Sequence, residues 1–252
     1  MADYLRLADA RVLLWMNHAL AAHPRLYLIG LFVTDKASDL ALGATALVLW
    51  FWPYRLTAWR DREPEAGMSI TGARRASRAR LIAFGAGGMS AYVIARLIAS
   101  ELDRPRPFAS YLPVEGLPGA FEGLRTFGTF PSDHAALLAA VPVAFACWSA
   151  TLGWAWAAAA IALAAVRIAV GFHYPLDILA GGVIGVVCTA VAMGAFDRRR
   201  GVYALTARVA DGFERPPQAY VLYAILGIGA LEFAAHFRHV LGALLWLRAR
   251  LG

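Results

Sequence analysis

Charged residues are scarce in this sequence, and lysine and cysteine are nearly missing. Charged side chains make up 16% of the 252 residues, hydrophobic ones make up 60%, and the mean hydropathy is +0.56. Such a composition is too apolar for a soluble domain of this length and predicts an integral membrane protein. The two cysteines, Cys147 and Cys188, both lie inside apolar runs. They therefore predict neither a disulfide framework nor a metal site.

The N-terminus also lacks the features of a cleavable signal peptide, which needs a basic start followed by an uninterrupted apolar core. Charges interrupt the apolar stretch at the start of this chain. We predict instead an amphipathic helix that lies at the membrane interface. Its apolar residues include Leu5, Leu13, Leu14 and Trp15.

Apolar runs long enough to cross a hydrocarbon core of roughly 30 Å recur along the whole chain. The sequence predicts spans at about 38–53, 79–101, 132–151, 153–170, 175–196 and 218–237. The expected fold is all-α: a polytopic membrane bundle of about six transmembrane helices, forming a single membrane domain over residues 1–252. The short apolar stretch that ends at Val33 fits either a re-entrant hairpin or a short crossing.

Arginine supplies almost all of the formal charge of +7, since Lys36 is the only lysine. The linkers 54–80 and 197–217 are rich in arginine and are therefore predicted to be cytoplasmic. Counting crossings then places residues 102–131 and the turn at 171–174 on the opposite side, with a tight turn near Gly153 back inside. Because topology explains this charge, nucleic acid is not predicted as a partner.

Three polar clusters interrupt the apolar pattern, and all three fall at span ends on the predicted outer side. Charged and titratable groups at membrane depth are costly unless they serve a site or pair with one another. The convergence of the clusters on one side therefore indicates a site. They are Arg104-Pro105-Arg106-Pro107-Phe108, Pro131-Ser132-Asp133-His134, and Arg167 with His173 and Asp177.

The third cluster has the spacing of a nucleophile with an orienting acid. Asp177 lies in the first turn of a helix that Pro175 begins, four residues after His173. Its carboxylate is placed to hold one ring nitrogen of His173 and to leave the other free as a nucleophile. Arg167 adds a planar fork of donors that matches phosphate oxygens. An isolated His and Asp would more often be a helix-capping pair, and Arg167 favours the functional interpretation.

The other two clusters suit anion binding and proton transfer. Ser132 is placed to cap the next helix, so that the backbone N–H groups of Asp133 and His134 form an anion site. His134 is there suited to protonating a departing group. Alternating prolines hold Arg104 and Arg106 out of helix, as a phosphate clamp needs. Taken alone, the second cluster fits an ordinary capped helix equally well, and the first fits an exposed loop.

These blocks, over about 79–196, resemble the signature of the type 2 phosphatidic acid phosphatase superfamily: Lys-x6-Arg-Pro, Pro-Ser-Gly-His and Ser-Arg-x5-His-x3-Asp. The resemblance implies a helical membrane bundle with a catalytic core at about 79–196 and no metal or other cofactor. It implies that His173 attacks phosphorus to form a phosphohistidine, that Asp177 orients it, and that His134 protonates the leaving group. The implied phosphate-binding residues are Arg106, Ser132 and Arg167.

The sequence departs from this signature at three positions. Val166 stands where the family usually has serine, and Asp133 replaces glycine, a variant similar to bacterial undecaprenyl-diphosphate phosphatases. Ala99 stands where the lysine is expected. Arg96, one helical turn earlier in the same span, is placed to bring its guanidinium near the absent ammonium, and Arg104 is an equal candidate from the loop. Arg96, Arg104 and Asp133 complete the predicted phosphate-binding set.

The sequence thus predicts a lipid phosphatase of the bacterial inner membrane, with its site facing the periplasm or cell exterior. The favoured substrate is undecaprenyl diphosphate, and membrane lipids are the only partners predicted, with no obligate protein partner. Alternatives within the enzyme class are phosphatases or phosphotransferases acting on phosphatidic acid, phosphatidylglycerol phosphate or lipid A. Outside that class, a catalytically silent lipid-binding membrane protein fits the missing lysine. The C-terminal Glu232, His236, Arg238 and His239 are better explained as an interfacial helix end than as a second site.

Overall fold

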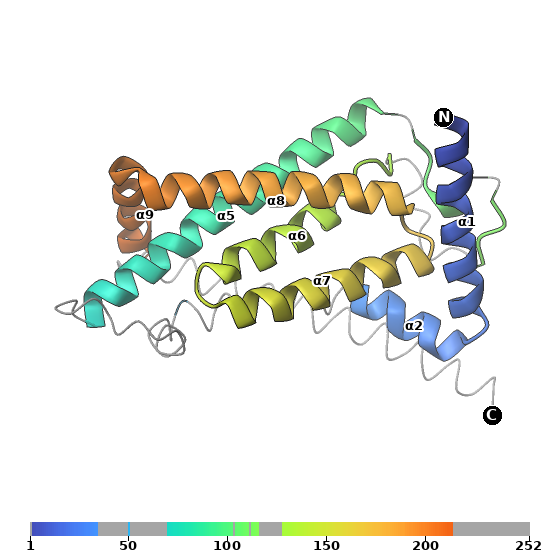
Figure 1. The fold of residues 1–252 in the computed structure, drawn as a ribbon, viewed down its shortest axis with the longest axis horizontal. Helices are drawn as coiled ribbons and strands as arrows, with labels where there is room; N and C mark the ends of the chain where they lie inside the picture. The colour runs from blue at the N-terminus through green and yellow to red at the C-terminus, as the bar shows by residue number, and fades with distance from the viewer. Residues whose placement is uncertain are drawn as a thin grey trace.

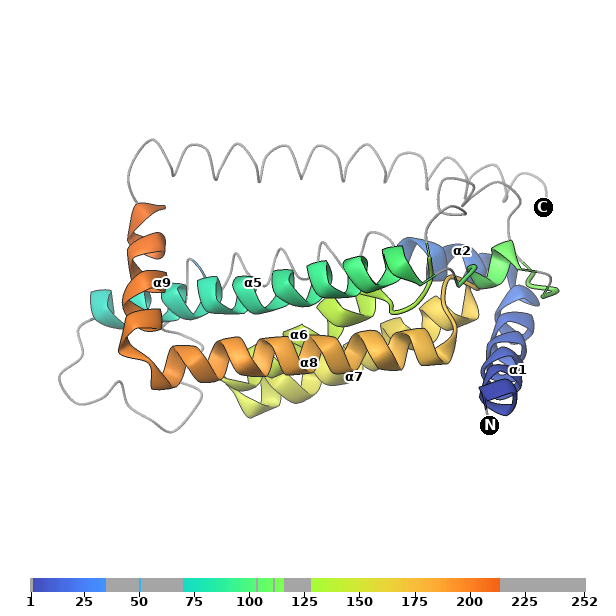
Figure 2. The ribbon, with the colours of Figure 1, turned by 90° about the horizontal axis from the view of Figure 1, so that it is seen from above.

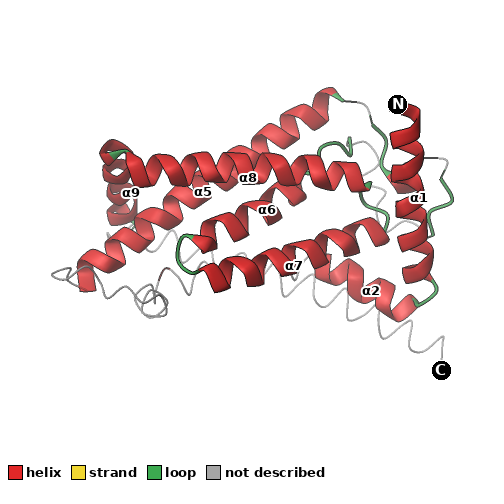
Figure 3. Cartoon of the chain, viewed as in Figure 1, coloured by secondary structure: helices red, strands yellow, loops and turns green. Residues whose placement is uncertain are grey.

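The computed structural model describes residues 2–34, 50, 70–102, 104–110, 112–115 and 128–213. Over these ranges all regular elements are helices and none is a strand, which confirms the predicted all-α class (Figure 3). Apart from residue 50, the spans predicted at 38–53 and 218–237 lie outside the described residues. The C-terminal group of Glu232, His236, Arg238 and His239 also lies outside them. The predicted number of about six crossings therefore stays a prediction.

Four helices form the bundle, and α6 lies at its centre. They are α5 (Ile70–Glu101), α6 (Asp133–Ala146), α7 (Ala150–Ala169) and α8 (Pro175–Arg198). α6 packs against α5, α7 and α8, and α8 also packs along α5 (Figures 1 and 2). In the described part of the chain, three helical segments are long and apolar enough to cross a membrane: Arg74–Glu101, α7 and α8. α6 is apolar but shorter.

The arginine-rich linkers are more helical than predicted. α5 begins at Ile70 rather than near 79, and α9 (Arg200–Gly212) occupies much of the linker 197–217. Arg75 joins the two helices, because its guanidinium makes a two-pronged ion pair with Asp211. Cross-links of this kind, together with the good helix propensity of arginine and alanine, extend the helices beyond their apolar stretches.

The turn between α6 and α7 lies at 147–149, earlier than the turn predicted near Gly153. Ser149 caps α7, with its hydroxyl oxygen accepting from the N–H of Leu152. Gly153 lies inside α7, where a Cβ atom would come within 2.9 Å of the Cα of Ala146. The glycine therefore serves close helix packing, which local turn signals cannot distinguish from a chain reversal.

A second close approach joins α6 to α8. A Cβ atom on Gly181 would collide with the carbonyl oxygen of Ser132, and one on Gly185 with that of Ala136. The two helix backbones are therefore nearly in contact at the end where α6 begins. This seam fixes the start of α6 against the first turns of α8.

α1 (Ala2–Ala21) lies across the bundle, beside the end at which α7 leads into α8 (Figures 1 and 2). Leu13 is fully buried and packs with Ile168 and Tyr174, whereas Trp15 is 74% exposed. The interfacial location of α1 stays a prediction. α2 (Pro24–Phe32) follows it, and its nine residues rise about 14 Å, too little to cross a bilayer alone.

Candidate active site

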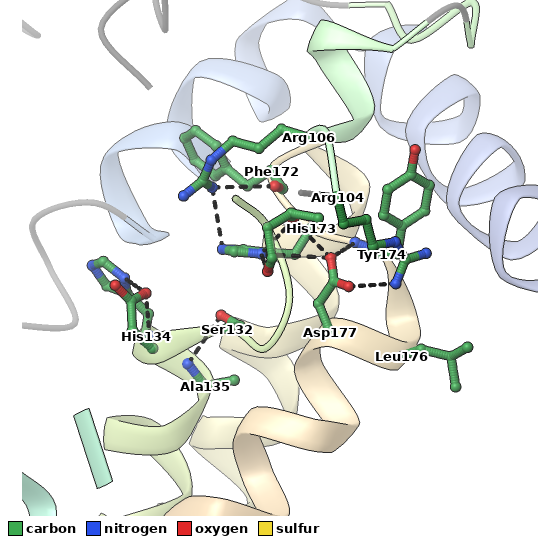
Figure 4. Close-up of polar contacts among 12 residues, drawn as sticks. Arg104, Arg106, Ser132, His134, Ala135, Phe172, His173, Tyr174, Leu176 and Asp177 are labelled. Carbon is green, nitrogen blue, oxygen red and sulfur yellow. Dashed lines mark hydrogen bonds and ion pairs between the residues drawn. The ribbon is translucent and has the colours of Figure 1, made fainter. Parts of the chain in front are cut away.

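The structure brings all three polar clusters to one end of the bundle (Figure 4). Residues 104–110 follow α5, Ser132–His134 begin α6, and His173 lies in the turn between α7 and α8. Within the described ranges, the arginine-rich start of α5 and the helix α9 lie at the opposite end (Figure 1). The clusters therefore converge as the sequence predicts, and away from the predicted cytoplasmic charge.

His173 is buried, with 3% of its side chain exposed, and faces Arg106. Its Nε2 lies 3.3 Å from Nη1 of Arg106, and a guanidinium can only donate. Nε2 must therefore carry a lone pair, and the proton of the neutral ring is on Nδ1. Nδ1 lies 3.1 Å from the carbonyl oxygen of Thr129, which can only accept, so both contacts agree on this tautomer.

Burial lowers the pKa of the His173 imidazole to about 4. The ring is therefore neutral at neutral pH. A neutral imidazole whose Nε2 lone pair points at a fixed cation is suited to attack an electrophile that the same cation binds.

Asp177 supports His173 through Thr129 rather than directly. Asp177 Oδ2 lies 3.7 Å from His173 Nδ1, beyond a hydrogen bond, which corrects the direct bond predicted from the spacing of four. The hydroxyl of Thr129 donates to Asp177 Oδ2 at 2.7 Å and lies 3.0 Å from His173 Nδ1. Sequence reasoning missed Thr129, whose only signal was its place just before Pro131-Ser132. The N–H of Tyr174 also donates to Asp177 Oδ2, closing the first turn of α8.

The second histidine has its own carboxylate. His134 Nδ1 lies 2.8 Å from Asp133 Oδ1, so Nδ1 carries the proton and Nε2 is left available. Arg96 of α5 lies 3.3 Å from Asp133 Oδ2. Ser132 caps α6 as predicted, with its hydroxyl accepting from the N–H of Ala135. Asp133, which replaces the family's glycine, thus contacts Arg96, the predicted substitute for the missing lysine.

Arg104 contacts two carboxylates, so its predicted role in binding phosphate has a competing structural explanation. It donates to Asp177 Oδ1 at 2.6 Å and to Asp9 Oδ2 at 2.5 Å, and its guanidinium lies over the ring of Tyr174. Two charge-assisted bonds commit the guanidinium to these acids. The side chain of Arg104 therefore holds Asp177, the acid that supports His173, in this structure.

Arg167 is buried close to the His173 turn. Its Nη1 donates to the carbonyl oxygen of Thr34 at 2.6 Å, and its guanidinium lies 5.8 Å from the ring of Phe172. Arg106 is equally buried and also donates to the carbonyl oxygen of Phe172. Arg106 and Arg167 therefore both contact Phe172, the residue that precedes His173.

The model of the PAP2 superfamily matches residues 80–200 of the chain. This region belongs to the PAP2 superfamily. Every predicted site residue, from Arg96 to Asp177, lies inside the PAP2 region, whereas Asp9 and Thr34, which bind two of the arginines, lie outside it.

Two curated proteins similar to this chain are both named BcrC. Undecaprenyl-diphosphatase BcrC of Bacillus subtilis is 30% identical over 111 residues, which are 44% of this chain and 55% of the relative. The bacitracin transport permease protein BcrC of Bacillus licheniformis is 29% identical over 99 residues, 38% of this chain and 48% of the relative. The chain thus spans about half the length of these relatives.

A solved PAP2 structure has the same fold. The transmembrane PAP2-type phosphatidylglycerolphosphate phosphatase from Bacillus subtilis aligns with a TM-score of 0.52 at 15% identity, covering 78% of this chain and 88% of that one. At this identity the likeness concerns the fold alone. Together with the three candidate spans in the described part of the chain, it supports an integral membrane protein.

Proposed function

We propose that this PAP2 protein is a membrane lipid phosphatase that removes a phosphate from a lipid carrier through a phosphohistidine. The observation that supports this most strongly is the contact between His173 and Arg106 at the centre of the site. His173 is neutral, and its Nε2 lone pair faces the guanidinium of Arg106 at 3.3 Å. A phosphate bound by Arg106 would therefore meet the nucleophile directly.

The first step transfers the phosphoryl group to the protein. A P–N bond forms to His173 Nε2 while the bond from phosphorus to the leaving oxygen breaks. His134, protonated on Nε2, gives that proton to the leaving oxygen, and Asp133 stabilises the imidazolium that precedes this transfer. Thr129 accepts from Nδ1 and keeps Nε2 directed at phosphorus.

The second step releases phosphate. Water attacks phosphorus, His134 takes a proton from the water, and the P–N bond breaks to restore neutral His173. Phosphoryl transfer depends mainly on positioning and on fixed positive charge around the phosphoryl oxygens. Arg106 supplies that charge at the nucleophile, and Arg96 and Asp133 lie close enough to act on Arg106 electrostatically.

The favoured substrate is undecaprenyl diphosphate. The similarity to a protein named undecaprenyl-diphosphatase, and the aspartate of Pro-Ser-Asp-His, support this choice. Phosphatidylglycerol phosphate is the second candidate, supported by the fold shared with the solved phosphatase. We place the site on the periplasmic face of the inner membrane, because the arginine-rich starts of α5 and α9 lie at the other end of the bundle.

Phosphate release by purified protein tests the proposal. Wild type should release phosphate from undecaprenyl diphosphate faster than from phosphatidylglycerol phosphate, phosphatidic acid or lipid A, and chelator should leave the rate largely unchanged. His173→Ala should abolish turnover, and rapid acid-free quenching of wild type should trap phosphate on histidine. Activity that survives His173→Ala would exclude this nucleophile, and no release from any of the lipids would support a catalytically silent protein.

A further inference from the structure

Asp9 of α1 is a buried acid with two specific partners, although it lies far outside the PAP2 region. Only 1% of its side chain is exposed. Its Oδ1 accepts from the N–H of Leu176 at 2.9 Å, and its Oδ2 accepts from Nη2 of Arg104 at 2.5 Å. A carboxylate this well buried is costly unless both oxygens are bonded to strong donors, and both are.

The partner Arg104 connects Asp9 to the acid of the site. Nη1 of the same guanidinium donates to Asp177 Oδ1 at 2.6 Å, and the other oxygen of Asp177 accepts from Thr129. A continuous line of hydrogen bonds thus runs from Asp9 through Arg104, Asp177 and Thr129 to Nδ1 of His173. Each link except the last carries at least one charge, which makes it short and directional.

Arg104 needs an opposing group to stay in this geometry. It has 26% of its side chain exposed and lines a cavity of about 600 Å³ together with Arg6, Ala10 and Tyr174. An arginine beside such a space has other orientations open to it. Because Asp9 binds one nitrogen while Asp177 binds the next, the plane of the guanidinium is fixed between two carboxylates.

The helix that carries Asp9 is itself firmly attached at this end of the bundle. Two turns further along α1, the buried Asn17 donates to the carbonyl oxygens of Ala169 and Glu115 and accepts from the N–H of Glu115. Leu13, between the two polar residues, is fully buried. α1 is therefore bonded on both sides of the α7–α8 turn that carries His173.

We propose that Asp9 is a positioning residue for the proposed phosphatase, acting through Arg104 on Asp177. α1 then helps to fix Arg104 and the first turn of α8, in addition to packing against the bundle. The inference rests on the proposed function, since its readout is turnover. It assigns to the N-terminal helix an effect on kcat that reaches the substrate through Arg104, Asp177 and Thr129 to His173.

Asp9→Asn tests this link with little change of shape. The amide oxygen still accepts from the N–H of Leu176, whereas the charge opposite Arg104 is lost. Asp9→Asn, Arg104→Ala and the double variant are compared for phosphate release from undecaprenyl diphosphate in detergent micelles. Arg11→Gln, which changes an exposed charge on the same helix, is the matched control.

We expect Asp9→Asn to lower kcat at least about fivefold with KM within about twofold of wild type, and Arg104→Ala to lower kcat further. The double variant should match Arg104→Ala, because Asp9 has no route to the site once Arg104 is absent. Arg11→Gln should behave as wild type. A kcat for Asp9→Asn within about twofold of wild type overturns the proposal, as does a double variant in which the two losses multiply.

The failure of the phosphatase proposal is distinguishable, because wild type would then release no phosphate in the same assay. If Asp9→Asn does not yield folded protein, Asp9→Glu takes its place in the comparison of single and double variants with Arg104→Ala. The longer side chain keeps the charge but displaces the carboxylate, so kcat should fall at least about threefold, and only when Arg104 is present. Wild-type kcat in Asp9→Glu, or an equal loss in the Arg104→Ala background, overturns the proposal.

Discussion

Replacing Thr129 by valine removes the hydroxyl between His173 and Asp177 and keeps the shape of the side chain. The hydroxyl donates to Asp177 at 2.7 Å and lies 3.0 Å from Nδ1 of His173. A hydrogen bond to a charged group contributes about 1.5–3 kcal/mol. If that contribution is lost from the transition state, kcat should fall about 10- to 150-fold. KM should change little, because the hydroxyl bonds to the protein and not to phosphate.

The measurement is phosphate release from undecaprenyl diphosphate, with the melting temperature of each variant recorded alongside. Thr129→Ser keeps the hydroxyl and should stay within about threefold of wild type. Thr206→Val is the matched control, since within the described residues that buried hydroxyl bonds only to carbonyls of its own helix at the other end of the bundle. A Thr129→Val protein with wild-type kcat would refute the relay and return Asp177 to direct contact with His173.

Three further predictions concern the contact between Arg96 and Asp133, the dependence of stability on pH, and the topology in the membrane. Arg96→Ala should lower kcat at least about tenfold, and much less in an Asp133→Asn background if Arg96 acts through that carboxylate. Because the His173 pKa is about 4 in the folded state and ordinarily 6.5, acidification from pH 6.5 to 4 protonates the unfolded chain first. The melting temperature should therefore fall over that window, and fall less in His173→Phe. In a background without the native cysteines, an impermeant thiol reagent should label Pro113→Cys from outside the cell and leave Gly201→Cys unlabelled, and the reverse result would place the site in the cytoplasm.

The convergence of the three polar clusters was predictable because the number of membrane spans between them determines on which side of the membrane each cluster lies. Ser132 and His173 stand at the ends of apolar spans, and counting those spans along the sequence puts both on one side of the membrane. Arg106 was predictable for the same reason, since the prolines around it fix an extended loop next to a span end. These inferences use only local periodicity and the length of a crossing.

Contacts between distant segments were not predictable from one sequence. Asp9 bonds to Arg104 across 95 residues, and nothing in the spacing of either residue indicates the other. In the sequence Asp9 reads as a charge interrupting an amphipathic stretch, which is also how a solvated residue would read. Gly153 likewise reads as a turn, because only tertiary packing shows that the missing side chain makes room for Ala146.

The shortness of α6 has a consequence for how deep the chemistry takes place. Its 14 residues rise about 21 Å, less than a hydrocarbon core of roughly 30 Å. Arg80 of α5 donates to the carbonyl oxygen of Cys147, which holds the far end of α6 at the level of the arginine-rich surface. If that level is one surface of the membrane, we expect His134 to lie several ångströms below the opposite surface. A site recessed in this way would favour anions that an attached tail draws into the bilayer, and we expect turnover by the proposed phosphatase to depend on the thickness of the surrounding lipid.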